Sequence, residues 1–352
     1  MKKLIIGAIA AFLFTALIYQ PTLVEVIKLR TFDALVQTDE PTGNVVLLNL
    51  TEDDIRNEGG WPFPRKRLAK IHIDLLNAGA ASVSWVAVFS EPDRFGGDVN
   101  FAEALSYYPS VIAMFETSGY REIPKTEGTV ILGDDIGGIT AKGVTQNIPI
   151  LRGVALQGIV SAPVDVDNLV RRMPLLMRSP DGWMASFGTQ LLKAVTGTNT
   201  YVIKTNANGI QEVRVKQLNP IPTDNNGRVW VNWVQPDSVS LDNMDVQGKM
   251  VIVGTTAKGI LPQVATPKGL LYPHQIQASL VETILHASNK PMPRIPQAAL
   301  LYEMLNFVFG VLLVYLFINY LGVYLGIIFS ALAIGGTGVL GYMLIQRGLL
   351  ID

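Results

Sequence analysis

Residues 44–50 read Asn-Val-Val-Leu-Leu-Asn-Leu, a short run in which every residue between the two asparagines is apolar. A run of this length is typical of a buried strand. Farther along, Arg65 to Ala78 places Leu68, Ile71 and Leu75 at helical spacing, and Gly79 supplies a stop. The pattern therefore predicts a buried strand followed by an amphipathic helix.

The same alternation continues after this helix. Residues 82–89 (SVSWVAVF) and 111–115 are predicted strands, and residues 100–106 between them are a predicted short helix. A β-α-β-α-β order favours parallel strands joined by right-handed crossovers. We therefore predict an α/β fold, with a largely parallel or mixed sheet flanked by helices.

The rest of this region is less regular, and residues 116–153 are expected to be mainly loop and edge structure. A hairpin is predicted across Asn206-Ala207-Asn208-Gly209, a typical turn composition. The further predicted segments are strands at 129–132, 201–205, 212–215, 228–234 and 250–254, and helices at 186–195 and 273–285.

Three apolar runs surround this polar region, and about 20 apolar residues are needed to cross the hydrocarbon core of a bilayer. Residues 1–21 are interpreted as an uncleaved signal anchor, and residues 297–319 and 320–346 as a hairpin of two further spans. This interpretation gives three transmembrane helices, an extracytoplasmic α/β domain at 22–296 and a short tail at 347–352.

The basic residues Lys2 and Lys3 favour a cytoplasmic N-terminus. The expected location is the inner (plasma) membrane, in contact with lipid, with the main domain periplasmic or extracellular. In the third span, Gly322, Gly326 and Ser330 form a stripe of small residues that favours close helix packing. Glu303 and Asn306 are polar candidates for contacts within the second span.

Composition excludes several classes of protein. The net charge of −1 argues against a nucleic-acid surface, and the absence of cysteine excludes disulfides and thiolate metal sites. The histidines have no metal-ligand spacing, and no nucleophile and base can be paired from the motifs present. We therefore expect no catalytic residue, no metal and no cofactor.

Seven motifs in order carry a resemblance to a known family. They are Leu29-Arg30-Thr31-Phe32-Asp33, Gly60-Trp61-Pro62-Phe63-Pro64-Arg65, Leu75-Leu76-Asn77-Ala78-Gly79-Ala80, Asp98 with Phe101-Ala102-Glu103-Ala104-Leu105, Asp165-Val166-Asp167 with Val170-Arg171-Arg172-Met173-Pro174-Leu175, residues 248–257, and Ala265-Thr266-Pro267. Together they resemble the second type of CHASE domain, an extracytoplasmic sensory module of bacterial cyclases and histidine kinases.

The resemblance implies a receptor that passes a ligand or partner signal to membrane helices and a cytoplasmic output. It also implies a homodimer or homo-oligomer and a small-molecule ligand of unknown identity. The output, an adenylate or guanylate cyclase or a histidine kinase, is expected in a partner or in a longer chain, because the family's usual last span has no counterpart here.

Asn49, Trp85 and Pro262 stand where the family tends to have acidic residues, so this chain is not expected to bind a cation through them. Asn168 replaces a turn glycine, which asparagine can do because it tolerates the left-handed conformation.

Several residues are candidates for ligand binding, each beside a structural interpretation. Trp61 and Phe63 are favoured as a cap on the core rather than a ligand platform. Residues 254–259 are favoured as a turn rather than an anion site, and Asp165 with Arg171 as a solvated, salt-bridged loop. The candidate ligand-binding residues are Trp61, Arg65, Asp165, Asp167, Arg171, Thr255, Thr256, Thr266 and His274.

The leading hypothesis is therefore a sensor without enzymatic activity of its own. A structural or scaffolding membrane protein that assembles with itself or a partner is the alternative, because the acidic positions are missing. An extracytoplasmic hydrolase is the least favoured.

Overall fold

The computed structural model describes residues 22–35, 38–117, 128–180 and 182–289, together with Thr15 and separate helical residues between 308 and 343. The chain divides into two compact units. One unit is Thr38–Met292, and the other combines residues 1–37 and 293–352. Helix α2 (Thr22–Leu35) belongs to the latter unit, and everything below concerns Thr38–Met292 unless stated.

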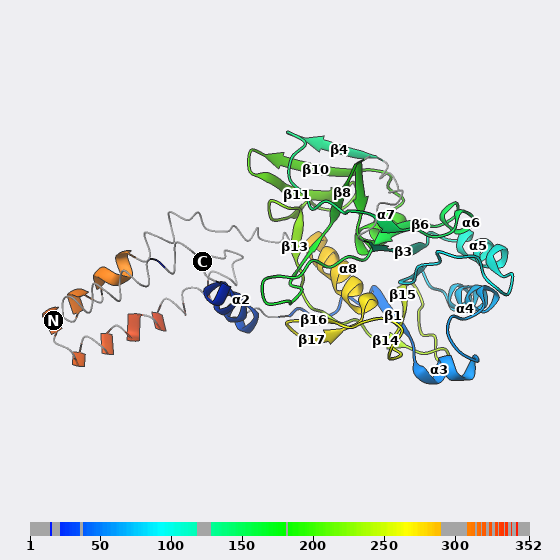
Figure 1. Ribbon diagram of the computed structural model, residues 1–352, viewed down its shortest axis with the longest axis horizontal. Helices are drawn as coiled ribbons and strands as arrows, with labels where there is room; N and C mark the ends of the chain where they lie inside the picture. Colours follow the sequence, from blue (N-terminus) through cyan, green and yellow to red (C-terminus); the bar gives the residue numbers. More distant parts are fainter. Residues whose placement is uncertain are drawn as a thin grey trace. The chain divides into compact units, whose positions relative to one another are not determined.

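A mixed sheet forms the centre of the unit (Figure 1). Its strands lie in the order β14-β1-β15-β2-β3-β5, and β6 also pairs with β3. Only β5 runs antiparallel to its neighbour within this sheet, which confirms the predicted largely parallel or mixed α/β fold. The strands are β1 (Val45–Leu50), β2 (Ser82–Trp85), β3 (Val111–Glu116), β5 (Val144–Thr145), β6 (Leu156–Ile159), β14 (Ser238–Val239) and β15 (Met250–Thr255).

Strand β15 comes from far along the chain and inserts between β1 and β2. It pairs with β1 in register from Val45 opposite Met250 to Leu50 opposite Thr255. On its other edge it pairs with β2, with Met250 opposite Ser82. The carboxyl ends of β1 and β15 therefore meet at one edge of the sheet.

Helices cover both faces of the sheet, as expected for parallel strands rich in aliphatic residues. Alternate residues of β1 point to opposite faces. Val46, Leu48 and Leu50 pack in one core with α4 (Arg65–Asn77), α5 (Asp98–Ser106) and α6 (Pro149–Arg152). Val45 and Leu47 pack in the other core with α7 (Phe187–Thr196) and α8 (Pro273–Asn289) (Figure 1). A short helix, α3 (Glu52–Asn57), follows β1.

A second sheet has four strands in the order β12-β11-β10-β4. It packs in the core that contains α7 and α8. The predicted hairpin is confirmed, because β10 and β11 pair antiparallel with Asn206 opposite Gly209. Its strands are β4 (Thr129–Leu132), β10 (Tyr201–Asn206), β11 (Gly209–Val215) and β12 (Ile221–Pro222). Three separate pairs complete the unit: β7 (Arg172–Pro174) with β13 (Arg228–Trp230), β8 (Leu176–Ser179) with β9 (Gly182–Ala185), and β16 (Val264–Thr266) with β17 (Gly269–Leu271).

The predicted fold class needs one correction. Among the described residues, no helix combines the length and the apolar character that crossing a membrane requires. Helices α2 and α8 have 14 and 17 residues, and α8 is used to cover the sheet. The three transmembrane helices are therefore not part of the observed fold, and what the structure supports is the mixed α/β architecture.

Candidate functional site

The carboxyl edge of the central sheet brings together residues from three distant segments. Asn49 lies near the end of β1, Gly254 lies opposite it on β15, and His274 is the second residue of α8. The His274 Nε2 atom is 2.8 Å from Asn49 Oδ1. In open parallel sheets this edge is where ligands bind. The predicted candidate His274 is thus placed at the position where the fold favours a site.

The His274 ring is fully buried against the backbone of β15. A Cβ atom added to Gly254 would lie 2.2 Å from the His274 Cγ, so only glycine permits this approach. Tyr272 stacks on the ring with centroids 6.1 Å apart, and burial lowers the pKa of His274 to about 4. At neutral pH the imidazole is therefore uncharged. Its Nδ1 has no hydrogen-bond partner within the described part of the chain.

The loop after β15, residues 254–259, resembles an anion site in its glycine content. Its backbone N–H groups are already engaged: Thr256 N donates to Leu50 O at 3.0 Å, and Ala257 N donates to Thr255 Oγ1 at 3.2 Å. Thr255 Oγ1 in turn donates to Leu50 O. Thr255 and Thr256 therefore tie the ends of β15 and β1 together, and this favours the interpretation of the loop as a turn.

A pocket of about 430 Å³ lies beside this cluster. Lys258 to Gln263 form its wall together with Tyr272, the residue that stacks on His274. The volume is at the lower end of the range for small-molecule sites. Its lining includes Lys258, and none of the side chains that line it is acidic.

The turn at Asp165 to Arg172 is a buried ion network. Arg171 is 1% exposed and binds Asp167 through two hydrogen bonds of 2.7 and 2.9 Å. Its Nη1 atom also lies 3.4 Å from the Asp165 carboxylate, which pairs with Arg172 as well. The interpretation of a solvated loop is wrong, because the charges satisfy one another inside the protein. Asn168 has φ 60°, which confirms the predicted left-handed conformation.

This network is joined to the β16–β17 hairpin. Val170 N donates to Ala265 O at 2.9 Å, next to the candidate Thr266. The Thr266 hydroxyl donates to Gly269 O at 2.7 Å and accepts from Lys268 N. Thr266 thus closes the hairpin turn, and the network and the hairpin form one structural unit.

A family comparison identifies the chain. The model of the CHASE2 domain matches residues 8–316 of the chain. The chain belongs to the CHASE2 domain family. CHASE2 domains are extracytoplasmic sensory domains of signalling proteins. No curated protein and no solved structure matches the chain.

Trp61 and Arg65 of this CHASE2 chain lie on the other face of the sheet. Phe63 is buried in the core with α4, and Trp61 packs against it at 5.5 Å between ring centroids. The Arg65 guanidinium lies 4.4 Å from the centre of the Phe89 ring, and burial lowers its pKa. The predicted cap on the core is confirmed, and these two candidates are not brought together with His274.

Asn49, Trp85 and Pro262, the three positions where the resemblance leads one to expect acidic residues, lie in different surroundings. Trp85 packs in the α4 core, where its Nε1 donates to His72 Nδ1 at 3.1 Å. Asn49 follows Val45 and Leu47 and so faces α8. Pro262 lines the pocket near Tyr272. These residues of the CHASE2 chain therefore do not form a single ligand set.

A second contact, which the sequence pattern did not predict, joins the α8 helix to the residues just before β1. The carboxylate of Glu282 is fully buried and accepts from Thr42 N at 2.9 Å and from Thr42 Oγ1 at 3.1 Å. Four residues later, His286 Nε2 lies 2.9 Å from Glu40 O. The sequence signal for this contact is Glu282 itself, the single acidic residue in the mostly apolar stretch 278–285.

Among the described residues, no group of three or more acidic or histidine side chains could hold a metal ion. The predicted membrane-packing residues lie outside the part of the chain that the structure describes: Glu303, Asn306, Gly322, Gly326 and Ser330.

Proposed function

We propose that this CHASE2 chain is the extracytoplasmic sensory part of a membrane-associated receptor whose output is a cyclase or a histidine kinase. The signal enters as a small molecule at the pocket beside Tyr272. Membership of an extracytoplasmic sensory family supports the location and the role. Because the lining includes Lys258 and no acidic side chain, a neutral or anionic ligand fits better than a cation.

One observation carries the proposal: two separate contacts join α8 to β1 and the residues before it. His274 contacts Asn49 beside the pocket, and Glu282, midway along α8, holds Thr42, close to where the chain enters the unit. A helix moves as a rigid element, so a ligand that shifts Tyr272 and His274 also shifts the contacts of Glu282. The signal would then reach both segments that lead out of the unit.

A ligand screen on the full chain tests this function. Neutral and anionic metabolites should raise the unfolding temperature, because binding to the folded state at 100 times Kd adds about 2.7 kcal/mol of stability. Tyr272→Ala and Lys258→Ala should remove the shift, whereas Lys216→Ala, on an exposed turn, should keep it. A shift that survives both pocket changes, or one given only by divalent cations, would contradict the proposed site.

Hydrogen exchange measures the second step. With a hit from the screen, protection should change in residues 38–44 and along α8 as well as around the pocket. A change confined to residues 258–272 would mean binding without transmission. Reporter fusions that are active only outside the cytoplasm, placed after residue 289, test the location.

The scaffolding alternative keeps one supporting observation. Asn49 contacts His274, and Trp85 is buried in the core. Two positions where the family resemblance leads one to expect acidic residues therefore serve packing in this chain. Under this alternative the chain assembles without a ligand. An ordered large assembly of purified chain, with no hit in the screen, would favour it.

A further inference from the structure

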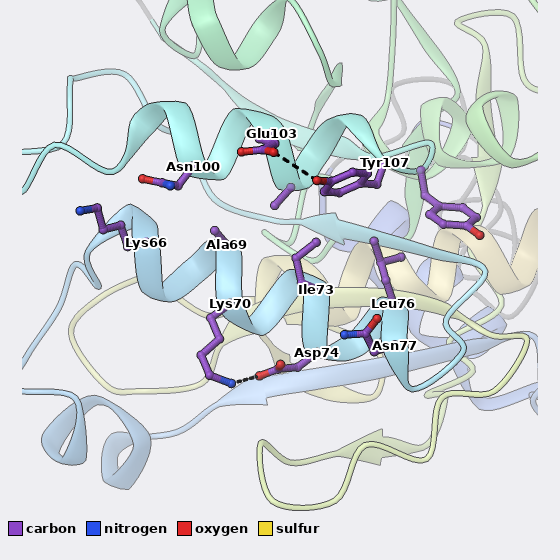
Figure 2. A pocket seen from close by; sticks show the side chains of 12 residues that line it. Lys66, Ala69, Lys70, Ile73, Asp74, Leu76, Asn77, Asn100, Glu103 and Tyr107 are labelled. Atoms are coloured by element: carbon purple, nitrogen blue, oxygen red, sulfur yellow. Dashed lines mark hydrogen bonds and ion pairs between the residues drawn. The ribbon is translucent and has the colours of Figure 1, made fainter.

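Two hollows of the unit, both apart from the pocket beside Tyr272, differ in the charges that line them. The larger one, about 840 Å³, is lined by residues of α4 and α5. Two lysines and two acidic residues belong to this lining, and Figure 2 shows Lys70 already paired with Asp74, at 2.6 Å. Its positive and negative charges therefore balance. The smaller hollow, about 190 Å³, has a single charged residue in its lining, Lys193.

The smaller hollow lies where β3 and β6 begin and α7 ends. Ser110 directly precedes β3 and Leu156 is the first residue of β6, and the two strands pair in parallel. The last turns of α7 contribute Lys193, and the segment after the helix contributes Thr198. The hollow is thus at the amino edge of the central sheet, opposite to the carboxyl edge that holds His274.

Lys193 places a positive charge inside the protein. The residue is 6% exposed, and its Nζ lies 5.1 Å from the centre of the Tyr201 ring. Burial raises the pKa of the Tyr201 hydroxyl, so this ring is a neutral neighbour. Every other residue that lines the hollow is uncharged. An anion in the hollow would therefore lie against a cation that is shielded from bulk water, where opposite charges attract strongly.

Thr198 adds a hydrogen-bond donor beside this charge. Its side chain is buried, and its Oγ1 is 3.4 Å from Thr196 Oγ1, a long contact. The Thr196 hydroxyl itself donates to Leu192 O at 2.7 Å. The Thr198 hydroxyl hydrogen can therefore turn to a ligand oxygen at little cost. The carbonyls of Lys193 and Ala194, which would repel an anion, already accept from the backbone of the turn after α7.

The remaining walls set the kind of anion. One ammonium group balances one negative charge, and the lining has no arginine fork of the kind that favours phosphate. Val154 and Leu156 give the hollow an apolar side. The volume is below the roughly 300 to 1,000 Å³ of pockets for drug-sized ligands. These properties together fit a small molecule with one carboxylate and a short hydrocarbon tail.

We propose that this hollow is a second ligand site, which binds a short-chain monocarboxylate. The carboxylate lies against Lys193 Nζ and the Thr198 hydroxyl, and the tail lies against Val154 and Leu156. The site is independent of the pocket beside Tyr272, because the two share no residue.

Titration with propionate tests the site on the full chain. The unfolding temperature should rise and saturate with sodium propionate, relative to the same concentrations of sodium chloride, because the ligand binds the folded state. Propionamide, which has a similar shape without the charge, should give no rise. Lys193→Met keeps most of the side-chain volume and should weaken propionate binding by about tenfold or more, as expected for the loss of one charge-assisted hydrogen bond. Lys142→Met, on an exposed loop, is the matched control and should bind as the natural chain does.

A second variant tests the volume without changing the charge. Leu156→Trp fills the hollow from a position that is 37% exposed, so it should weaken propionate binding while the chain stays folded. Tyr272→Ala should leave propionate binding unchanged, which separates this site from the pocket of the proposed function. The proposal is overturned if propionate acts only as chloride does, if Lys193→Met binds it as tightly as Lys142→Met, or if phosphate binds more tightly than propionate.

Discussion

His274 on α8 and Asn49 on β1 meet at 2.8 Å over a glycine, while Glu282, midway along α8, binds Thr42 just before β1. His274 and Glu282 are eight residues apart, or about 12 Å of helix. Each contact links a buried side chain of α8 to a polar group of the β1 segment. The helix and the strand therefore have a defined relative position, and the following predictions examine what sets it.

The stability of the fold should decrease below pH 6.5. Burial lowers the pKa of both His72 and His274 to about 4, whereas an unfolded histidine titrates near 6.5. Between these values the unfolded chain binds more protons, so stability is complete above pH 6.5 and is lost as the pH falls toward 4. Each histidine contributes a loss of roughly 3 kcal/mol across this window. Urea unfolding at several pH values measures it.

Variants separate the two histidines in this experiment. His274→Gln should remove about half of the pH dependence, because it removes one of the two buried rings. A pH profile that is flat between 6.5 and 4 would show that neither buried ring stays neutral in the folded state.

The contact between Glu282 and Thr42 should show energetic coupling. Glu282→Ala leaves two Thr42 donors without an acceptor, and hydrogen bonds to charged groups contribute about 1.5 to 3 kcal/mol. Thr42→Val keeps the backbone donor to Glu282 and removes the hydroxyl, which also accepts from the exposed Asn44 N, and it should cost less. In a double-mutant cycle of unfolding free energies we expect a coupling of about 1 kcal/mol. Fully additive costs would mean that the two residues act independently.

Gly254→Ala should be strongly destabilising, because the new Cβ meets the His274 ring at 2.2 Å. Overpacking of this kind costs about 1 to 3 kcal/mol. His274→Ala should relieve the clash, so the double variant should be more stable than the sum of the single costs predicts. Gly153→Ala, where the nearest atom is 3.3 Å away, is the comparison and should lower the unfolding temperature much less than Gly254→Ala.

Removing one charge from the buried ion network should lower the free energy of unfolding far more than removing one from an exposed ion pair. Asp167→Ala leaves Arg171 buried without its closest partner, and breaking a buried pair costs about 3 to 5 kcal/mol. Asp53→Ala breaks an ion pair of 2.9 Å with side chains 74% and 80% exposed, and should cost under about 1 kcal/mol. Denaturant unfolding compares the two. Equal costs would contradict the burial argument.

Local patterns in the sequence predicted much of the α/β unit. The helical spacing of Leu68, Ile71 and Leu75 corresponds to α4, and the turn at Asn206 to Gly209 corresponds to the β10–β11 hairpin. The left-handed Asn168 was also predictable. Each of these depends on residues a few positions apart, so period and turn chemistry are sufficient evidence. The predicted membrane spans lie mostly outside the described residues, among which no helix is long and apolar enough to cross a membrane.

The pairing of distant segments was decided only by the tertiary structure. The sequence by itself determined parallel strands and the helices that follow them, together with the order of motifs that marks a CHASE2 domain. The fold alone placed β15 between β1 and β2, buried the charges of Arg171 and Asp167, and brought His274 to Asn49 and Glu282 to Thr42. These contacts join residues far apart in the chain, and no local period records which distant side chain will satisfy a buried polar group.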